Sequence, residues 1–569
     1  MPPLRWIDPP PLPPELPCLH DDPLLHALLA ARVADRAAAG RFLDAAMRPL
    51  PDPFVLPGMD AAVERVRQAI ARKETVAIYG DYDADGVTSA AIAALALRAA
   101  SGGVVPAAIS LPTREWGYGL HGPEIERLAE RGVTLLLAVD CGGSDRAEVA
   151  LARSHGMDVV IVDHHDMPDG APEGAIVVST RVRPGAPYAD LSAAGLALLL
   201  ASGLARHGLD VGNGPGQEPR GLLDLAMIGT VADVCDLRGA TRAIVRDGLR
   251  QMRVQPRPGL LALTKAIGLE PAKLDSRAIG RRIGPAINAP GRAGNPRPAL
   301  DLLLADDIWT ANGHAAEALA ALATIRSERA RLLERELDRV TTDPDERERP
   351  VLVVACDDCP HGIAGTLAGE LVKAVQRPVV VLSRDGDFYR GSARSHGEFD
   401  MGGALRSAAE LLVRTGGHRK AAGLVVHEDR VADLRDWLGR CAAAAGVAAL
   451  EPAIQIDADI ALERVALPTI ALLDRLRPFG EGNPEPLLRV RGAVADDRRV
   501  IGSDGRHLKL RLRGPLGPVD AVGWGMADRL PEIAGAPRLD LVGRLGRNEW
   551  NGRRMAQLLL EDLRPAMEL

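Results

Sequence analysis

Three apolar segments of this sequence each run directly into acidic or imidazole side chains. The segments and the residues that follow them are TVAIYG (75–80) before DYDADG (81–86), VTLLLAV (133–139) before Asp140, and DVVIV (158–162) before Asp163-His164-His165. In an open parallel sheet, ligands bind at the carboxyl ends of the strands. If these strands are neighbours, the polar groups converge, and such a cluster repels itself unless cations neutralise it. The spacing therefore predicts a site for more than one metal ion.

The donor types in this cluster indicate which ions it would hold. Asp81, Asp83 and Asp85 alternate along an extended turn, so their carboxylates can face one site. An EF-hand is excluded because the loop follows a strand and lacks a glutamate at its twelfth position. Asp140 could bridge two ions from the next strand. His164 adds a nitrogen ligand, which favours Mn²⁺ or a similar transition ion over Mg²⁺ or Ca²⁺.

A pair of such ions has a specific chemical use. Two divalent cations roughly 3.5–4 Å apart stabilise the attacking and leaving oxygens of phosphoryl transfer, so no protein nucleophile is required. The sequence contains no G-x-S-x-G nucleophile turn and no G-x-x-x-x-G-K-[ST] loop for ATP. These absences disfavour a serine hydrolase, a motor and a kinase.

Four further clusters are rich in glycine and polar residues. They are GPAINAPGR (284–292), HGIAG (361–365), GSARS (391–395) and GGHRKAAG (416–423). Glycine lets the backbone approach a ligand closely, and arginine suits phosphate. Each cluster alone is typical of an ordinary turn, whereas four of them together favour a phosphate-rich substrate.

Composition limits the class of protein. The net charge of −7 means that a nucleic acid would have to meet local basic patches, for which residues 276–300 and 489–513 are candidates, although each is more simply a solvated face. Six scattered cysteines fit a reducing compartment, and the Cys356–Cys359 pair lacks the second pair that a zinc site needs. No segment approaches the roughly 18 apolar residues of a membrane span, so we expect a cytoplasmic protein.

The pattern of apolar residues predicts an α/β multidomain protein. Helices are expected over 191–205 and 221–234, and a long helix is expected over about 300–342, where Asp343-Pro344 ends it. The expected regions are a proline-rich N-terminal segment with one helical stretch (1–58), a parallel-sheet catalytic lobe (59–240), a helical connector (241–349), a second α/β lobe (350–450) and a C-terminal β-barrel (452–569).

With DYDADG, Asp140, Asp163-His164-His165 and TVAD in this order, the chain resembles the DHH phosphoesterase superfamily. GPAINAPGR, GSARS and GGHRKAAG are similar to the second lobe of its RecJ family, and PFGEGNPEP (478–486), DGRHLKLRL (504–512) and NEWNGRR (548–554) resemble that family's oligonucleotide-binding (OB) domain. The likeness covers roughly residues 59–565. It implies a DHH lobe, a connecting helix, a DHH-associated lobe and an OB-type barrel.

The resemblance also implies roles for individual residues. One metal ion would be held by Asp81, Asp83 and Asp140. The other would be held by Asp85, Asp140, His164 and Asp233, although Asp233 taken alone resembles a helix cap or a salt-bridge partner. His165 would touch the scissile phosphate. The 5′-terminal phosphate and its neighbours would be received by four residues, with His418 near the substrate: Arg114, Arg292, Ser392 and Arg394.

The activity implied is 5′→3′ hydrolysis of single-stranded DNA to 5′-mononucleotides in recombination and repair, with two Mn²⁺ ions or Mg²⁺. Partners implied by the resemblance are a single-strand-binding protein and a RecQ-type helicase, and we expect a monomer. In the barrel, Trp524 and Trp550 are the available stacking platforms, but the apolar strand VDAVGWG predicts a core position for Trp524. Two alternatives remain open: a DHH phosphodiesterase for short oligonucleotides or cyclic dinucleotides, and a non-catalytic DNA-binding scaffold.

Overall fold

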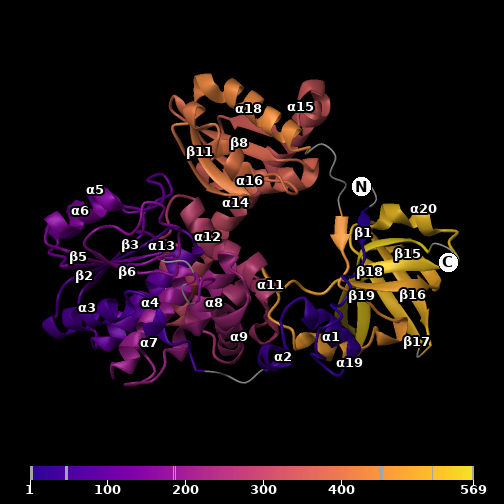
Figure 1. Ribbon diagram of the computed structural model, residues 1–569, viewed down its shortest axis with the longest axis horizontal. Helices are drawn as coiled ribbons and strands as arrows, with labels where there is room; N and C mark the ends of the chain where they lie inside the picture. Colours follow the sequence, from indigo (N-terminus) through magenta and orange to yellow (C-terminus); the bar gives the residue numbers. More distant parts are fainter. Residues whose placement is uncertain are drawn as a thin grey trace. The chain divides into compact units, whose positions relative to one another are not determined.

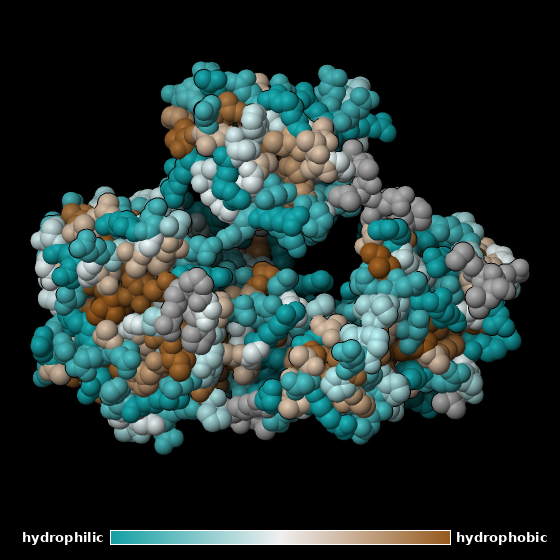
Figure 2. All heavy atoms as spheres, viewed as in Figure 1, coloured by the Kyte–Doolittle hydropathy of each residue, from teal (hydrophilic) through white to brown (hydrophobic). Residues whose placement is uncertain are grey.

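A computed structural model describes residues 4–44, 49–182, 185, 188–446, 453–515, 517–550 and 552–566. The chain divides into two compact units, one of residues 48–450 and one that joins residues 1–47 to 451–569. Polar residues cover most of the face of each unit seen in Figure 2. Among the described residues, no helix combines the length and apolar character needed to cross a membrane.

The larger unit begins with a five-stranded parallel sheet of order β3-β2-β4-β5-β6. Its strands are β2 (Val76–Gly80), β3 (Ala107–Ser110), β4 (Leu135–Val139), β5 (Asp158–Val162) and β6 (Ala175–Val178). The register pairs Gly80 with Val139, and Val139 with Val162. The three strands predicted to be neighbours are therefore adjacent, and they end at the same edge of the sheet.

Helices cover both faces of this sheet, as Figure 1 shows. They are α3 (Met59–Arg72), α4 (Ala84–Ala100), α5 (Gly122–Glu130), α6 (Arg146–Ser154) and α7 (Ala193–Arg206). Alternate strand residues face opposite sides. Ile78 and Leu137 belong to the core that includes α3, α4 and α7, whereas Tyr79 and Leu136 belong to the core that includes α5 and α6. Burial on both faces explains why these strands read as continuous apolar runs.

A helical region follows. Its helices are α8 (Leu223–Ala232), α9 (Gly239–Val254), α10 (Pro258–Ala266), α11 (Ser276–Ala278), α12 (Gly284–Arg292), α13 (Arg297–Leu304), α14 (Ile308–Thr342) and α15 (Pro344–Glu348). The long helix predicted from about residue 300 is thus divided, because Asp307 caps a new start at Ile308. As predicted, α14 ends at Asp343-Pro344.

The second lobe of the larger unit has a mixed sheet of order β10-β11-β9-β8-β7. Its elements are β7 (Leu352–Cys356), α16 (His361–Val375), β8 (Val379–Asp385), β9 (Phe388–Arg394), α17 (Met401–Arg406), β10 (Arg414–His418), β11 (Ala421–His427) and α18 (Val431–Ala444). The face with α16 joins the core of the preceding helices, including α14, and the other face packs on α17 and α18.

The smaller unit contains a seven-stranded sheet of order β13-β14-β18-β19-β17-β16-β15. Its strands are β13 (Ala458–Asp459), β14 (Leu488–Ala493), β15 (Ala495–Ile501), β16 (His507–Gly514), β17 (Gly517–Gly523), β18 (Leu539–Trp550) and β19 (Arg553–Pro565), with helices α19 (Leu467–Asp474) and α20 (Leu530–Ile533). Leu508, Leu510 and Leu512 alternate into its core, as the sequence pattern predicts.

The N-terminal residues are part of this smaller unit. Strand β1 (Arg5–Ile7) pairs in parallel with β12 (Ala453–Gln455), and Trp6 Nε1 donates a hydrogen bond to Asp562 Oδ2 at 2.7 Å. The one helical stretch predicted here is two helices, α1 (Pro23–Ala30) and α2 (Arg36–Leu43), because Asp35 caps a second start through Ala38 N. The other regional boundaries drawn from the sequence stay predictions.

Candidate active site

The acidic residues after β2 and β4 meet at the shared edge of the parallel sheet. Carboxylate oxygens of Asp81, Asp83 and Asp140 lie within 4.8 Å of one another. Asp81 and Asp140 are only 4% and 2% exposed. Asp140 has a left-handed backbone with φ of 64°, which is uncommon for a non-glycine residue and typical of constrained functional positions. Three carboxyl groups are thus held together, two of them buried.

The aspartates of DYDADG make different contacts around the first turn of α4. Asp83 caps the helix, because its Oδ1 accepts hydrogen bonds from the backbone N–H of Asp85 at 2.9 Å and of Gly86 at 3.1 Å. The Ala84 N–H donates instead to Asn288 Oδ1 on α12, at 2.7 Å. The GPAINAPGR cluster therefore fixes the acidic turn from outside.

Asp85 points at the start of another helix. The backbone N–H groups of Ala193 and Ala194, the first residues of α7, donate to its two carboxylate oxygens at 2.8 and 3.0 Å. A helix N-terminus favours negative charge, which helps this buried carboxylate to stay ionised. The carboxylate also needs Gly229 on α8, since a Cβ there would lie 2.4 Å from Asp85 Oδ1.

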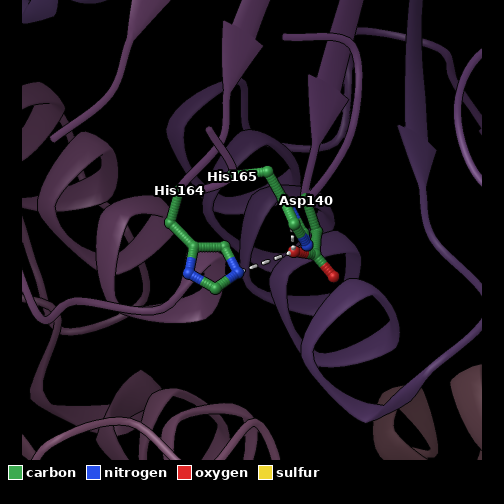
Figure 3. A group of neighbouring side chains, drawn as sticks. All are labelled: Asp140, His164 and His165. Carbon is green, nitrogen blue, oxygen red and sulfur yellow. Dashed lines mark ion pairs between the residues drawn. The ribbon is translucent and has the colours of Figure 1, made fainter. Parts of the chain in front are cut away.

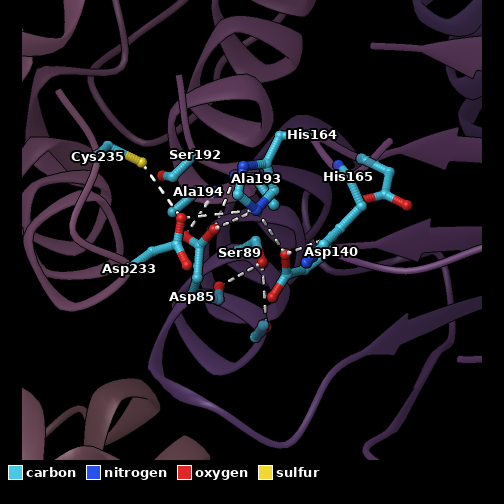
Figure 4. A network of polar contacts seen from close by, with 12 residues as sticks. Asp85, Ser89, Asp140, His164, His165, Ser192, Ala193, Ala194, Asp233 and Cys235 are labelled. Atoms are coloured by element: carbon cyan, nitrogen blue, oxygen red, sulfur yellow. Dashed lines mark hydrogen bonds and ion pairs between the residues drawn. The ribbon is translucent and has the colours of Figure 1, made fainter. Parts of the chain in front are cut away.

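His164 lies among these carboxylates, at the distances of ion pairs but with no hydrogen bond from Nε2 to any of them (Figures 3 and 4). Its Nε2 lies 3.4 Å from Asp140 Oδ1, 3.7 Å from Asp233 Oδ2 and 3.8 Å from Asp85 Oδ2. Burial lowers the pKa of His164 below its usual value, which keeps a lone pair on the ring. The buried atoms His164 Nε2, Asp140 Oδ1 and Asp81 Oδ1 have no hydrogen-bond partner.

These unpartnered atoms fit a metal ion. Two ligand atoms that are each about 2.1 Å from one ion lie about 3.0–3.4 Å apart, close to the spacing around His164 Nε2. Carboxylates with a neutral imidazole suit Mn²⁺ and similar ions. Buried polar atoms normally have partners, so an ion is the simplest group to satisfy these.

Asp233 reaches the cluster from the last turn of α8. It is the C-cap of that helix, and Val234 follows with a left-handed φ of 60°. The Val234 N–H donates to Val231 O and the Cys235 N–H donates to Thr230 O, which is a Schellman ending. Glycine usually occupies the position of Val234, so the strained turn marks a constrained place.

His165 has a different environment from His164. Its Nδ1 lies 2.8 Å from Asp163 Oδ1, and its backbone N–H donates to the same oxygen at 3.1 Å. The Tyr118 hydroxyl lies 3.0 Å from the same Nδ1. Burial opposes the charged ring, but the hydrogen bond to Asp163 together with the negative charges of Asp163, Asp233 and Asp85 outweighs burial and raises the pKa of His165 to about 9. Asp163 therefore favours the protonated form of His165.

The acidic cluster carries an electrostatic cost. Burial, followed by the neighbouring carboxylates, raises the pKa values of Asp81, Asp85 and Asp140 well above the usual range. Burial raises the pKa of Asp233 as well. Like charges in a buried site need compensation from outside the cluster, which divalent cations supply.

A second cluster, here called the arginine cluster, consists of Arg114 after β3, Arg292 at the end of α12 and Arg394 at the end of β9. Burial and then Arg114 lower the pKa of Arg292 to about 10, and the same two causes lower the pKa of Arg394. These guanidinium groups thus repel one another in a partly buried place. An anion with several oxygens would compensate them, and planar guanidinium groups match phosphate.

The two clusters are tied together through Tyr82, which lies between Asp81 and Asp83. The guanidinium carbon of Arg114 lies 4.9 Å from the centre of the Tyr82 ring. Helix α12 approaches the same residue so closely that a Cβ on Gly291 would lie 2.2 Å from Tyr82 O. Arg292 follows Gly291 and donates from Nη1 to Gly362 O at 3.1 Å. The arginine cluster is therefore held at a set place beside the acidic one.

The two remaining residues proposed for the substrate lie in the second lobe. Ser392 Oγ accepts a hydrogen bond from Arg394 Nη1 at 3.1 Å, so it belongs with the arginine cluster. His418 is the last residue of β10 and is exposed. Its place near the substrate stays a prediction.

The basic run 489–513 of the smaller unit consists largely of paired charges. Lys509 Nζ lies 2.7 Å from Asp520, and Arg506 and Arg513 each lie 2.5 Å from a carboxylate. A cavity of about 480 Å³ beside β16 and β17 includes Arg499, Lys509 and Arg511 in its lining. Most of the charge of this run is therefore explained by a solvated, ion-paired face, the simpler of the two interpretations of the sequence.

The prediction that Trp524 lies in the core is wrong. The side chain is 63% exposed and packs edge to face on His507, with ring centres 4.8 Å apart. Strand β17 ends at Gly523, and Gly525 turns the chain with a φ of 72°, so the alternation of the strand does not extend to Trp524. The side chain of Trp550 lies outside what the structure describes.

Comparison with known proteins assigns the family. Three family models match the chain: the DHH family N-terminal domain over residues 75–230, the DHHA1 domain over 348–444 and the RecJ OB domain over 456–562. The single-stranded-DNA-specific exonuclease RecJ of Bacillus subtilis (strain 168) is 33% identical over 96% of this chain and 68% of the relative. RecJ of Dickeya dadantii (strain 3937) is 32% identical over 95% of this chain and 96% of the relative. The chain belongs to the RecJ family.

Solved structures agree with this RecJ assignment. The crystal structure of RecJ in complex with Mn²⁺ from Thermus thermophilus matches with a TM-score of 0.83 at 29% identity, covering 99% of this chain and 80% of that one. The Mg²⁺ complex of RecJ from the same organism matches with a TM-score of 0.76 at 28% identity, covering 99% and 79%. The predicted α/β architecture, with a parallel-sheet DHH lobe and a C-terminal OB domain, is confirmed.

Sequence reasoning gave no individual role to several residues of this candidate site. Asp163 orients His165 and also accepts the Gly143 N–H at 3.1 Å. Asn288 holds the acidic turn, and Tyr118 contacts His165. Cys235 donates from Sγ to Asp233 Oδ2 at 3.3 Å, and burial raises its pKa well above the usual thiol value. Proximity to Asp233 in the sequence is a signal for Cys235, whereas only the fold brings Tyr118 and Asn288 to the site.

Proposed function

We propose that this chain is a metal-dependent exonuclease that hydrolyses single-stranded DNA from its 5′ end and releases 5′-mononucleotides. The observation that carries the proposal is the pairing of a buried acidic cluster, in which atoms of Asp81, Asp140 and His164 lack hydrogen-bond partners, with an adjacent arginine cluster. One suits divalent cations and the other suits a phosphate, so together they suit a metal-assisted reaction at a phosphorylated end. The relatives named single-stranded-DNA-specific exonuclease support the choice of substrate.

The acidic cluster would hold two ions. Asp81, Asp83 and Asp140 would bind one, and the other would be bound by four residues with Asp140 shared: Asp85, Asp140, His164 and Asp233. When bound, the ions neutralise the carboxylates and stabilise the charge on the attacking and leaving oxygens of phosphodiester hydrolysis. Mn²⁺ is the preferred ion because of the imidazole ligand, and Mg²⁺ is a substitute.

His165 would contact the scissile phosphate directly. Its hydrogen bond to Asp163 fixes the ring and favours the protonated form. A protonated imidazole can donate a hydrogen bond to a non-bridging phosphate oxygen, where negative charge increases during the reaction. Tyr118 would assist, because its hydroxyl lies against the same Nδ1 and its ring packs against the imidazole.

The arginine cluster would determine where the strand is cut. Arg114, Arg292 and Arg394 would bind the 5′-terminal phosphate, with Ser392 beside Arg394. Because contacts at Tyr82 and Gly291 hold this anchor beside the acidic cluster, the same phosphodiester bond would be presented for cleavage each time. A fixed anchor explains a mononucleotide product without any need to read the base.

The smaller unit would bind a further stretch of the same strand. The exposed Trp524 offers a stacking face for a base, and Arg499 and Arg511 line the cavity beside β16 and β17. Such binding is tolerant of sequence and weakens as salt increases. A cytoplasmic location, a monomeric state, and contacts with a single-strand-binding protein or a RecQ-type helicase stay predictions from the family.

One assay tests this proposal. A 5′-labelled oligonucleotide, single-stranded or in a blunt duplex, is incubated with Mn²⁺, with Mg²⁺ or with chelator. We expect the label to appear at once as mononucleotide, from the single strand alone and only with metal. A label that first appears in fragments longer than a mononucleotide, or cleavage in chelator, would contradict it.

A phosphodiesterase of short oligonucleotides is the second candidate. Its chemistry is the same, but the OB domain over residues 456–562 gives no benefit to a substrate of two nucleotides. Intact long DNA together with rapid hydrolysis of dinucleotides would favour this candidate. Binding of DNA with no hydrolysis of either substrate would favour a scaffold.

A further inference from the structure

A thiol lies at the edge of the acidic cluster. Ligand atoms of His164, Asp233 and Cys235 all lie within 4.8 Å of one another. In Figure 4, Cys235 stands beside Asp233, and a dashed line joins its sulfur to that carboxylate. Cys235 is half-buried, whereas the cysteine next to Asp140 in the sequence, Cys141, is fully buried.

The backbone fixes this thiol where it is. The Schellman ending of α8 binds the Cys235 N–H to Thr230 O at 3.2 Å, and the left-handed Val234 turns the chain back on itself. As a result, residues two positions apart present their side chains to the same point. The position of Cys235 therefore follows from the turn that also presents Asp233.

Two neighbouring atoms point to a ligand at this place. His164 Nε2 and the deeply buried Asp140 Oδ1 lack hydrogen-bond partners, and they lie 3.4 Å apart. His164 Nε2 is also 3.7 Å from Asp233 Oδ2. A nitrogen donor without a hydrogen-bond partner thus lies beside an oxygen and a sulfur donor, which are hydrogen-bonded to each other.

This donor set differs in kind from the rest of the cluster. Oxygen ligands with one imidazole suit Mn²⁺ and Mg²⁺, whereas sulfur is a soft ligand that those ions use poorly. Zn²⁺ takes Cys, His and Asp together, usually in tetrahedral geometry, and binds most mixed sites more tightly than Mn²⁺ does. A thiol at this position therefore changes which ion is held most strongly.

We propose that Cys235 is an accessory ligand that makes the ion position beside His164 and Asp233 selective for Zn²⁺ over Mn²⁺. Zn²⁺ would be held by these three residues, and the thiol proton would pass to solvent as the sulfur binds. Mn²⁺ would leave the thiol as a bystander. The consequence is competition, in which Zn²⁺ replaces the Mn²⁺ of the catalytic centre. The inference rests on the proposed metal-dependent function.

The test uses the full chain and Co²⁺, a coloured stand-in for Zn²⁺. Co²⁺ is added to the wild type, to Cys235→Ala, to Cys235→Ser and to Cys441→Ser, a matched half-buried thiol on α18. We expect a near-ultraviolet sulfur-to-cobalt band in the wild type and in Cys441→Ser, absent from both Cys235 variants. The Cys356–Cys359 pair is present in all four proteins, so only a band that depends on Cys235 counts. Excess Zn²⁺ should remove it.

Calorimetry gives a second readout. Loss of the sulfur ligand in Cys235→Ala should weaken Zn²⁺ binding by about tenfold or more, with less than about a threefold change for Mn²⁺. Equal losses for both ions would overturn the inference.

The outcomes separate this inference from the proposed function. Co²⁺ that binds with its visible bands, but without any charge-transfer band that depends on Cys235, overturns the inference and leaves the metal centre in place. If the wild type binds neither Co²⁺ nor Mn²⁺, both the inference and the proposed metal centre are overturned.

Discussion

Two regions of this protein concentrate charged residues, and they do so in opposite ways. At the edge of the parallel sheet, buried carboxylates lie beside other carboxylates, and partly buried guanidinium groups lie beside other guanidinium groups. Atoms of Asp81, Asp140 and His164 there lack hydrogen-bond partners. In the smaller unit, Arg489 is almost wholly buried, yet it pairs with Asp459 and with Asp8. One region leaves its charges for a ligand, and the other satisfies them internally.

The difference shows what a count of charges in a sequence can and cannot indicate. The run 489–513 has more basic residues than the neighbourhood of Arg292, but most of its charge is taken up by ion pairs with nearby acids. Exposed ion pairs contribute at most about 1 kcal/mol each and signal little about function. Buried like charges are costly, so they persist where a ligand compensates them.

The largest effect should follow from breaking the acidic cluster. Asp140→Asn keeps the shape of the side chain but removes the charge shared by both proposed ions. Several kcal/mol of transition-state stabilisation would be lost, so cleavage of single-stranded DNA should fall by about 10³-fold or more. Initial rates on the labelled oligonucleotide measure this.

Asp158→Asn is the matched control, because Asp158 lies at the opposite end of β5 and pairs with Arg65 and Arg153. It should retain the rate per folded molecule. Equal losses in the two variants would mean that Asp140 acts through folding.

Metal binding should stabilise the larger unit against unfolding. Mn²⁺ at 100 times its dissociation constant should stabilise the larger unit by about 2.7 kcal/mol, because only the folded cluster binds it. Thermal unfolding with and without chelator measures the effect. The smaller unit, whose charges are paired, should show no such dependence; a shift of equal size in that unit would contradict the comparison.

A smaller effect should follow from a substitution in the arginine cluster. Arg394→Gln removes one charged donor to the terminal phosphate, which is worth about 1.5–3 kcal/mol. KM for a 5′-phosphorylated strand should rise by about 10- to 100-fold, and the preference over a 5′-hydroxyl strand should disappear. Arg384→Gln is the control, since Arg384 already pairs with Asp357 and Glu428. A preserved end preference in Arg394→Gln would remove this residue from the anchor.

Weakening an ion pair in the smaller unit should affect stability alone. Asp459→Asn leaves the buried Arg489 with a weaker partner, and because Asp459 is itself 44% exposed the cost should be about 1–2 kcal/mol of unfolding free energy. Chemical denaturation measures it. The exposed pair of Arg513 and Asp496 supplies the control, since Arg513→Gln should cost less than about 0.5 kcal/mol. Hydrolysis of short oligonucleotides should not change in either variant.

The smallest effect should come from Trp524→Ala. A base stacked on an aromatic ring contributes about 1–3 kcal/mol, and one exposed ring should give the low end of that range. Affinity for a long single strand should therefore fall by about fivefold, while cleavage of short strands stays the same. Unchanged affinity would assign the ring to packing against His507.

Much of the site could be predicted because parallel strands bring distant residues to one edge. Asp81, Asp140 and His164 follow adjacent strands, so their meeting needs only the strand order. Asp233 is different, since it caps a helix and is a candidate only through the family resemblance.

Other features depend on contacts that a sequence pattern does not encode. Strand β1 pairs with β12 across more than four hundred residues, so the N-terminal segment could not be assigned to the smaller unit. The exposure of Trp524 depends on where β17 stops. The orientation of His165 depends on Asp163, which the sequence places at the site only as part of its motif.

The most direct test of the central claim is an anomalous difference map from a crystal of this protein grown with Mn²⁺. We expect two peaks: one among Asp81, Asp83 and Asp140, and one beside His164, Asp233 and Asp85. A map with no peak at the edge of the parallel sheet, at an Mn²⁺ concentration that supports cleavage, would contradict it.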